Sequence, residues 1–223
     1  ESKVIDFIKK HILLFLLVAV TIIAIFLRVC GMDFQSDDFN SFLNSWWSII
    51  KLNDFTGLAT QVGNYNIPYQ IIIYLMTLLP LNALYAYKIV SIIFDFVLAI
   101  STAMLAYSFA KNNRRLKAIL TYSAVLLSAT VIFNSSFWAQ CDSIYTSFII
   151  LAILFLHKDK PIASFVFIGI AFAFKLQTVF IIPVLLYYWI STKKISILHF
   201  FIIPAVDVIM CLPAIIMGRP FID

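Results

Sequence analysis

The chain has 223 residues, of which 63% are hydrophobic and only 12% are charged, and its net charge is +5. A soluble domain carries about 25% charged residues, and a globular core could not bury this much apolar side chain. The composition therefore excludes an ordinary soluble protein and indicates an all-α integral membrane protein. The positive charge alone gives no reason to expect a nucleic-acid partner, because its placement along the chain matters more.

Apolar runs taken in chain order predict the membrane spans, since a helix needs about 20 apolar residues to cross a bilayer core. Four runs approach or exceed that length, and a fifth, from 143 to 156, is shorter. The long run from 161 to 190 is broken in its middle by Lys175, Leu176 and Gln177, which indicates two short helices that meet there. We therefore expect about seven transmembrane helices, at residues 12–30, 83–110, 117–133, 143–156, 161–174, 177–190 and 195–217.

The orientation follows from the basic residues, because Lys and Arg in short loops favour the cytoplasmic side. With seven spans and the N-terminus inside, eleven of the 16 Lys and Arg residues fall in inner segments. If residues 67–81 also spanned, "KNNRRLK" at 111–117 would move outside; if 161–190 were one helix, "STKK" at 191–194 would move outside. We therefore predict one transmembrane module over residues 1–223 with an outer loop at 31–82, and we expect it to be part of a longer protein.

The outer loop at 31–82 is too long for a structureless connection. Its stretch "FNSFLNSWWSIIKL" repeats apolar residues at helical spacing, which predicts an amphipathic helix at the membrane interface. Asp37 and Asp38 precede or cap this helix, where free N–H groups and the helix dipole favour carboxylates. A purely capping role is the alternative for both, and we expect Asp33 to be only solvated.

Four outer segments bring polar side chains to the same face of the membrane, whereas the inner loops carry little beyond Lys and Arg. Each helix beside Lys175 covers only about 20 Å, so Lys175 should lie at membrane depth, facing protein or water. The alternatives are that Asp142 caps the fourth span, that Lys175 snorkels to the surface, and that Arg219 is a plain loop cation. The candidate site residues are Asp37, Asp38, Tyr65, Asn66, Tyr69, Gln140, Asp142, Lys175, Gln177 and Arg219.

Carboxylates, amides and cations at one membrane face suit two kinds of function. One is translocation of an ion or substrate. The other is group transfer, in which a carboxylate takes a proton from an acceptor hydroxyl and cations hold a phosphate leaving group. Nucleotide sugars stay in the cytoplasm, whereas a sugar on a lipid phosphate reaches an outer site from within the bilayer.

Four stretches together resemble the GT-C glycosyltransferase superfamily, most closely bacterial membrane proteins similar to GPI mannosyltransferases. The resemblance covers essentially the whole chain, and its motifs occur in the same order as in that family. Three residues depart from the family pattern, namely Ile67 and Leu176 where proline is common and Ala139 where glycine is usual. The matching stretches are "SDDFNSFLNSWW" at 36–47, "GNYNIPYQIIIYLMTLLP" at 63–80, "WAQCDSIYT" at 138–146 and "FKLQTVFIIPVLL" at 174–186.

The resemblance implies a seven-span module whose first outer loop holds two interfacial helices, here Phe39–Leu52 and Ile67–Leu79. It implies inverting transfer of a sugar, for example a hexose such as mannose, from a polyprenyl-phosphate donor to a hydroxyl of a glycan, lipid or protein. It also implies a bacterial cytoplasmic membrane with the active site facing outside.

The resemblance also implies residue roles. Asp38 would be the base and Asp37 would substitute for it or assist it. The side chains expected near the lipid phosphate are Lys175, Gln177 and Arg219, while Gln140 and Asp142 would line the cavity between donor and acceptor; Tyr65, Asn66 and Tyr69 fall in a matching stretch.

The sequence identifies no certain cofactor and leaves open a divalent metal at Asp33, Asp37 and Asp38. The three cysteines show no metal-ligand spacing, and the sequence does not support a Cys30–Cys141 disulfide. The alternative to an enzyme is a transporter or lipid flippase subunit without transferase activity. Such a protein predicts internal repeats and ionisable residues reachable from both faces, neither of which we find. A third alternative is a non-enzymatic assembly subunit, for which Asp38→Asn would leave function intact.

Overall fold

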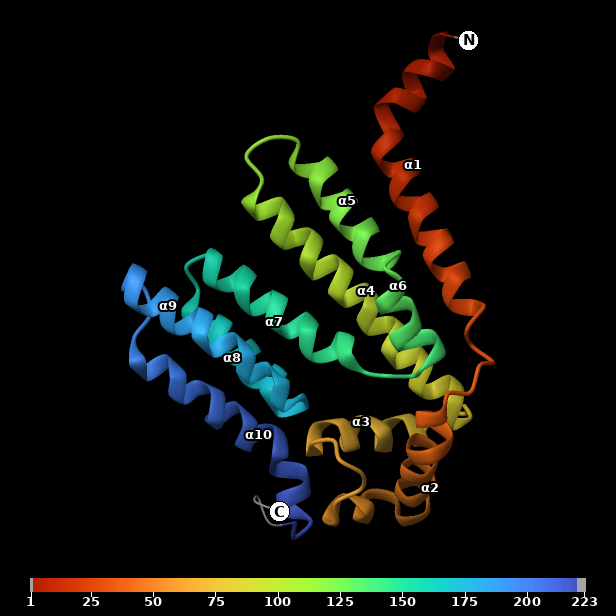
Figure 1. The fold of residues 1–223 in the computed structure, drawn as a ribbon, viewed down its shortest axis with the longest axis vertical. Coiled ribbons are helices and arrows are strands. Elements are labelled where there is room, and N and C mark those ends of the chain that lie inside the picture. The colour runs from red at the N-terminus through yellow and green to blue at the C-terminus, as the bar shows by residue number, and fades with distance from the viewer. Residues whose placement is uncertain (1, 220–223) are drawn as a thin grey trace.

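The computed structural model describes residues 2–219, and this part of the chain is all-α (Figure 1). It contains ten α-helices, joined by loops and by five short 3-10 or π-helical segments. The α-helices are α1 Ser2–Val29, α2 Asn44–Asn53, α3 Ile67–Thr77, α4 Ala83–Phe109, α5 Arg114–Leu126, α6 Ala129–Ile132, α7 Asp142–His157, α8 Pro161–Phe174, α9 Ile182–Thr192 and α10 Ile202–Ile216. The short segments are π-helical Phe39–Leu43 and Phe133–Phe137 and 3-10 Asp54–Ala59, Leu176–Ile181 and Ile197–Phe201.

Several helices are long and apolar enough to cross a membrane, which supports the expected membrane integration. Within the described residues there are three such segments, Lys10–Val29, Ala83–Phe109 and Ile197–Ile216. A fourth is a bent pair, in which residues 114–126 and 129–137 meet at 51°. The remaining apolar helices, including α7 and α8, have 10–17 residues.

The long helices lie side by side, in the spatial order α1, α5, α4, α7, α8, α10 (Figure 1). The N-terminus and the connections from α4 to α5 and from α7 to α8 lie at one end of this bundle (Figure 1). The helices α2 and α3 lie at the opposite end, where α3 crosses below the ends of the longer helices (Figure 1). The polar outer loop and the basic connections are therefore at opposite ends of the molecule.

The outer loop is packed onto the bundle rather than extended away from it. Phe39, Leu43, Trp47 and Ile50 form the buried stripe of the first interfacial helix, as its apolar spacing predicts. They share a core with α3, α4 and α7, in which Tyr87 of α4 donates a hydrogen bond to the carbonyl oxygen of Leu43 at 3.0 Å. This packing holds the loop's polar residues against the end of the bundle.

The third predicted span, 117–133, lies within a longer bent pair of helices. The helix begins at Arg114, breaks after Leu126 and continues as helical turns to Phe137. A break exposes backbone carbonyls that must find another donor inside a membrane. Arg28 of α1 supplies one, because its Nη1 donates to the carbonyl of Leu126 at 3.0 Å.

Candidate functional site

Asp38 lies at the start of the first interfacial helix, and its carboxylate is exposed. Gln140 donates a hydrogen bond from Nε2 to the Asp38 carboxylate at 2.8 Å. The Oε1 atom of Gln140 in turn accepts a hydrogen bond from the hydroxyl of Tyr65 at 2.7 Å. Three segments that are distant in sequence thus meet at one carboxylate, and the other face of that carboxylate stays open to solvent.

The cap of this helix is Ser36, which corrects the expectation that Asp37 or Asp38 caps it. The Oγ atom of Ser36 accepts from the backbone N–H of Phe39 at 3.1 Å, and Asp38 makes no side-chain cap bond. Ser36 also donates to the carbonyl of Trp138 at 3.3 Å, which joins the helix start to the 134–142 segment. Because Ser36 satisfies the helix end, the Asp38 carboxylate is available for Gln140.

The segment that carries Gln140 turns sharply at Ala139, whose backbone has a φ of 58° and is fully buried. This left-handed conformation is costly for a residue with a side chain, and glycine adopts it freely. The turn is held by the N–H of Gln140, which donates to the carbonyl of Asn134 at 2.8 Å.

Lys175 forms an ion pair with Asp142, which is the first residue of α7. Lys175 follows the end of α8 in an extended conformation, with φ −153° and ψ 125°, so its side chain leaves the helix axis. Asn134 donates to the second oxygen of Asp142 at 2.9 Å. The carboxylate of Asp142 therefore accepts hydrogen bonds from both Lys175 and Asn134.

Tyr65 lies between the Asp38–Gln140 contact and the Asp142–Lys175 ion pair. The ammonium nitrogen of Lys175 lies 5.8 Å from the centre of the Tyr65 ring and 5.5 Å from that of Tyr145. We call Asp38, Tyr65, Asn134, Gln140, Asp142 and Lys175 the outer cluster.

Buried aromatic groups support the outer cluster from behind. Tyr69 is buried, and its ring centre lies 4.7 Å from that of Tyr65. Burial is the largest cause that raises the pKa of the Tyr65 hydroxyl, so the hydroxyl stays protonated and can keep donating to Gln140. Burial also raises the pKa of the Cys141 thiol to about 11, which keeps this thiol neutral at pH 7. Cys141 is therefore a packing residue and not an activated nucleophile.

One glycine fixes the loop before Tyr65. Gly63 has a φ of 75°, and a Cβ atom there would lie 2.3 Å from the ring of Trp46. The same Trp46 ring packs edge-on against Tyr65, with ring centres 5.6 Å apart. The close approach of Gly63 to Trp46 thus sets the position of the Tyr65 hydroxyl.

Four predicted site residues are not joined to the outer cluster by the contacts that the structure describes. Arg219 is buried and donates from Nη1 to Oε1 of Gln70 in α3 at 2.9 Å, which ties the end of α10 to the outer loop. Asp37, Asn66 and Gln177 are exposed, and Asn66 is the N-terminal flanking residue of α3.

One ion pair lies inside the bundle, between Arg28 of α1 and Asp95 of α4, with an N–O distance of 2.9 Å. Ser135 and Ser143 donate to the same carboxylate at 2.6 and 2.5 Å. We call Arg28, Asp95, Ser135 and Ser143 the buried network; its signal in the sequence was a charged residue inside each of two apolar runs.

The loop between α1 and Ser36 is also held by polar contacts that the sequence did not predict. Lys88 is fully buried and donates to the backbone carbonyls of Gly31, at 2.7 Å, and Met32, at 3.0 Å. Tyr85 donates to Asp33 at 2.6 Å, so the expectation that Asp33 is only solvated is wrong.

The three aspartates of this loop do not assemble as a metal site. Among the described residues, no group of three or more His, Cys, Asp or Glu side chains lies close enough to hold a metal ion. All three cysteines are free. The chemistry that the outer cluster offers is thus that of an open carboxylate beside a cation, two amides and a tyrosine hydroxyl.

Comparison of the chain with family models, with curated proteins and with solved structures finds no significant match.

Proposed function

We propose that this chain is the membrane module of a GT-C-type glycosyltransferase that moves a sugar from a polyprenyl phosphate to an acceptor hydroxyl. The observation that carries the proposal is the geometry at Asp38. Its carboxylate is exposed, and it is oriented by Gln140, which is itself oriented by Tyr65. An oriented carboxylate that remains open to solvent suits a general base.

The arrangement of helices supports seven crossings with this cluster on the outer side. Three long helices, one bent pair and three of the four shorter apolar helices, α7, α8 and 176–192, account for seven segments; the fourth, α3, crosses below the ends of the longer helices (Figure 1). Two connections carry basic residues, the one from α4 to α5 and the one from α7 to α8. Both lie at the same end of the bundle as the N-terminus (Figure 1). Because Lys and Arg favour the cytoplasm, that end is the inner one in the proposal, in a bacterial cytoplasmic membrane.

The proposed reaction is a single displacement at the sugar carbon. The Asp38 carboxylate takes the proton of the acceptor hydroxyl while the hydroxyl oxygen forms a bond to that carbon. The bond from the carbon to the phosphate oxygen breaks, and its electron pair leaves with polyprenyl phosphate. Attack from the side opposite the leaving group inverts the configuration.

Lys175 is proposed to stabilise the negative charge on the leaving phosphate. Its side chain is only 20% exposed, and screening by water is weaker there than at the surface. Asp142 and the neighbouring tyrosine rings hold the ammonium group in place before the donor arrives. The donor phosphate would then share the ammonium group with Asp142.

The test is a transfer assay on membranes that contain the full-length protein. Labelled polyprenyl-phosphate hexoses, mannose among them, are supplied as donors, and the release of polyprenyl phosphate is followed. Asp38→Asn should reduce release by about 100-fold or more, because general bases contribute about 10²–10⁴. Asp54→Asn is the matched control, since Asp54 is an exposed acid of the same loop outside the cluster.

Unchanged release by Asp38→Asn would reject the role of Asp38. Absence of release by the wild-type protein with every donor in the panel would count against the transferase and favour a transport or assembly role.

A further inference from the structure

A groove at the opposite end of the bundle is unrelated to the outer cluster. It lies between α1, α4 and α5 and has a volume of about 650 Å³, which is within the usual range for ligand pockets. Its walls are mostly apolar. The apolar lining residues are Leu17, Ile100, Ala103, Met104, Ala118 and Ile119.

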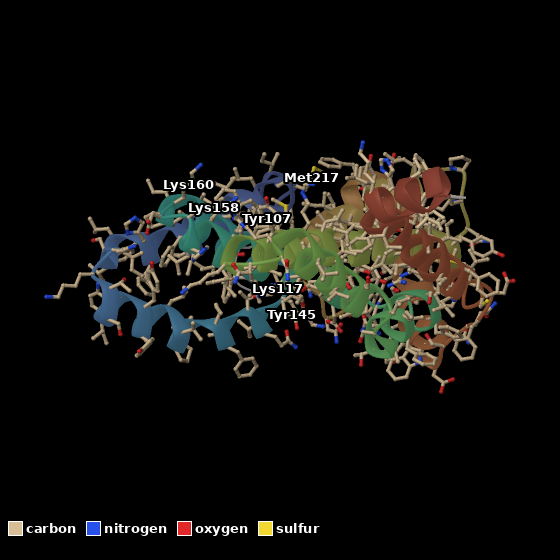
Figure 2. All side chains as sticks on the ribbon, turned by 90° about the horizontal axis from the view of Figure 1, so that it is seen from above. Tyr107, Lys117, Tyr145, Lys158, Lys160 and Met217 are labelled. Carbon is tan, nitrogen blue, oxygen red and sulfur yellow. The ribbon has the colours of Figure 1, made fainter. Side chains whose placement is uncertain are left out.

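The mouth of the groove carries cations. Arg114, at the start of α5, and Lys158, at the end of α7, both line it. Figure 2, seen from this end, shows Tyr107 and Lys158 near one another where α4 and α7 end. The apolar wall therefore leads to two positive charges that come from different helices.

Arg114 is held in a defined position. Its Nε donates to the carbonyl of Tyr107 at 3.0 Å, and its guanidinium carbon lies 4.3 Å from the centre of the Tyr107 ring. This hydrogen bond uses Nε, so the terminal NH₂ groups stay available to an anion. Pre-positioned arginine groups of this kind suit phosphate, which they can bind through two hydrogen bonds.

A second hollow of about 410 Å³ continues the groove across α1. The two share Leu17, Tyr107, Ala118 and Ile119, and the second one adds Lys10 and Arg115. The positive charge at this end is thus not confined to the mouth of one cavity.

We infer that this groove binds an anionic phospholipid of the inner leaflet. One acyl chain lies along the apolar wall, and the phosphate lies between Arg114 and Lys158. Charge complementarity selects this occupant, because a soluble anion has no use for the apolar wall and a zwitterionic lipid gains little from two cations. Basic pockets between membrane helices on the cytoplasmic side are typical sites for anionic head groups.

The experiment uses the purified full-length protein after removal of bound lipid. Dioleoyl phosphatidylglycerol and dioleoyl phosphatidylcholine are added in equal amounts, and the protein-bound lipid is measured by native mass spectrometry. The wild type should prefer phosphatidylglycerol. The double variant Arg114→Gln/Lys158→Gln should lose about 10-fold or more of this preference, since each juxtamembrane cation contributes to anionic-lipid binding.

The matched control is Lys51→Gln/Lys193→Gln, which removes the same charge at exposed positions that do not line the groove. It should bind phosphatidylglycerol as the wild type does. Ala103→Phe fills the apolar wall and should weaken binding while both cations remain. Thermal unfolding of each variant shows whether it is folded.

Equal binding of the two lipids by the wild type would overturn the inference. An equal loss of the preference for phosphatidylglycerol in the double variant and in its control would also overturn it. The inference would also be overturned if the wild type were a dimer that Ala103→Phe converts to a monomer while the amount of bound lipid stays the same. The groove would then bind a second copy of the chain.

Discussion

Two carboxylates in this molecule are held by side chains from distant segments, yet they differ in access. Asp95 is fully buried and is bonded by Arg28, Ser135 and Ser143. Asp38 is exposed and receives one described side-chain hydrogen bond, from Gln140. An enclosed carboxylate with several donors cannot meet a substrate hydroxyl, whereas an oriented and open one can. In this membrane protein, a carboxylate that is exposed and has few hydrogen-bond donors is therefore a better candidate for catalysis than a charged residue inside an apolar run.

The two regions are also connected. Ser135 and Ser143, which bond Asp95, flank the segment that carries Gln140 and Asp142, and Asn134 directly precedes Ser135. The buried network therefore fixes in place the same chain segment that supplies three residues of the outer cluster. Breaking either one should have a distinct effect, on folding in the first case and on chemistry in the second.

The largest expected effect is on stability, from removing one partner of the buried ion pair. Asp95→Leu leaves the Arg28 guanidinium buried without a counter-charge and should cost about 3–5 kcal/mol. Thermal unfolding in detergent measures the loss. The double variant Arg28→Met/Asp95→Leu should recover much of it, because no uncompensated charge remains. A single variant as stable as the wild type would contradict a structural role for the pair.

The next effect concerns the cation of the outer cluster. Lys175→Met should lower the release of polyprenyl phosphate by about 100-fold or more while the protein stays folded, because a charge that stabilises the leaving phosphate is lost. Asp142→Asn is the comparison, since it removes the ion-pair partner of Lys175 but keeps the cation. Equal loss in the two variants would mean that the pair serves structure and not the phosphate.

A smaller effect is expected at the residue that orients Asp38. Gln140→Leu removes the hydrogen bond to the carboxylate and should lower release by about 10-fold, the equivalent of one ordinary hydrogen bond. Unchanged release by Gln140→Leu would contradict an orienting role for Gln140.

The smallest effect is a difference in the chemical labelling of two cysteines, which tests the orientation of the chain in the membrane. Cys30 is exposed at the end of α1, whereas Cys141 is buried with its pKa raised to about 11. A membrane-impermeant maleimide added to intact cells at pH 7 should therefore modify Cys30 and spare Cys141. The Cys30→Ser variant is the control. Protection of Cys30 until the cells are opened would reverse the proposed topology.

Elements bounded by strong local signals were predicted well. The sequence predicted a helix over 161–174, and α8 spans Pro161–Phe174; proline at its start and Lys175 at its break mark both ends. The sequence placed α4 within one residue of its observed range, 83–109. The meeting of Asp142 and Lys175 on one side also followed from topology, although their direct pairing did not.

The contacts that were not predicted depend on how the helices are rotated about their axes, or on which of several similar residues caps a helix. Arg28 and Asp95 pair because of how α1 and α4 face each other, and an apolar run does not reveal that angle. Ser36, Asp37 and Asp38 are three good capping residues in a row, so local preference could not choose among them. The packing of Ser36 against the 134–142 segment made the choice.

The most direct test of the central claim is the rate of polyprenyl-phosphate release by Asp38→Asn in the full-length protein, measured beside the wild type and Asp54→Asn. The account predicts that Asp38→Asn binds the donor but releases at least about 100-fold less product, while Asp54→Asn releases as much as the wild type. Wild-type release by Asp38→Asn would contradict the account.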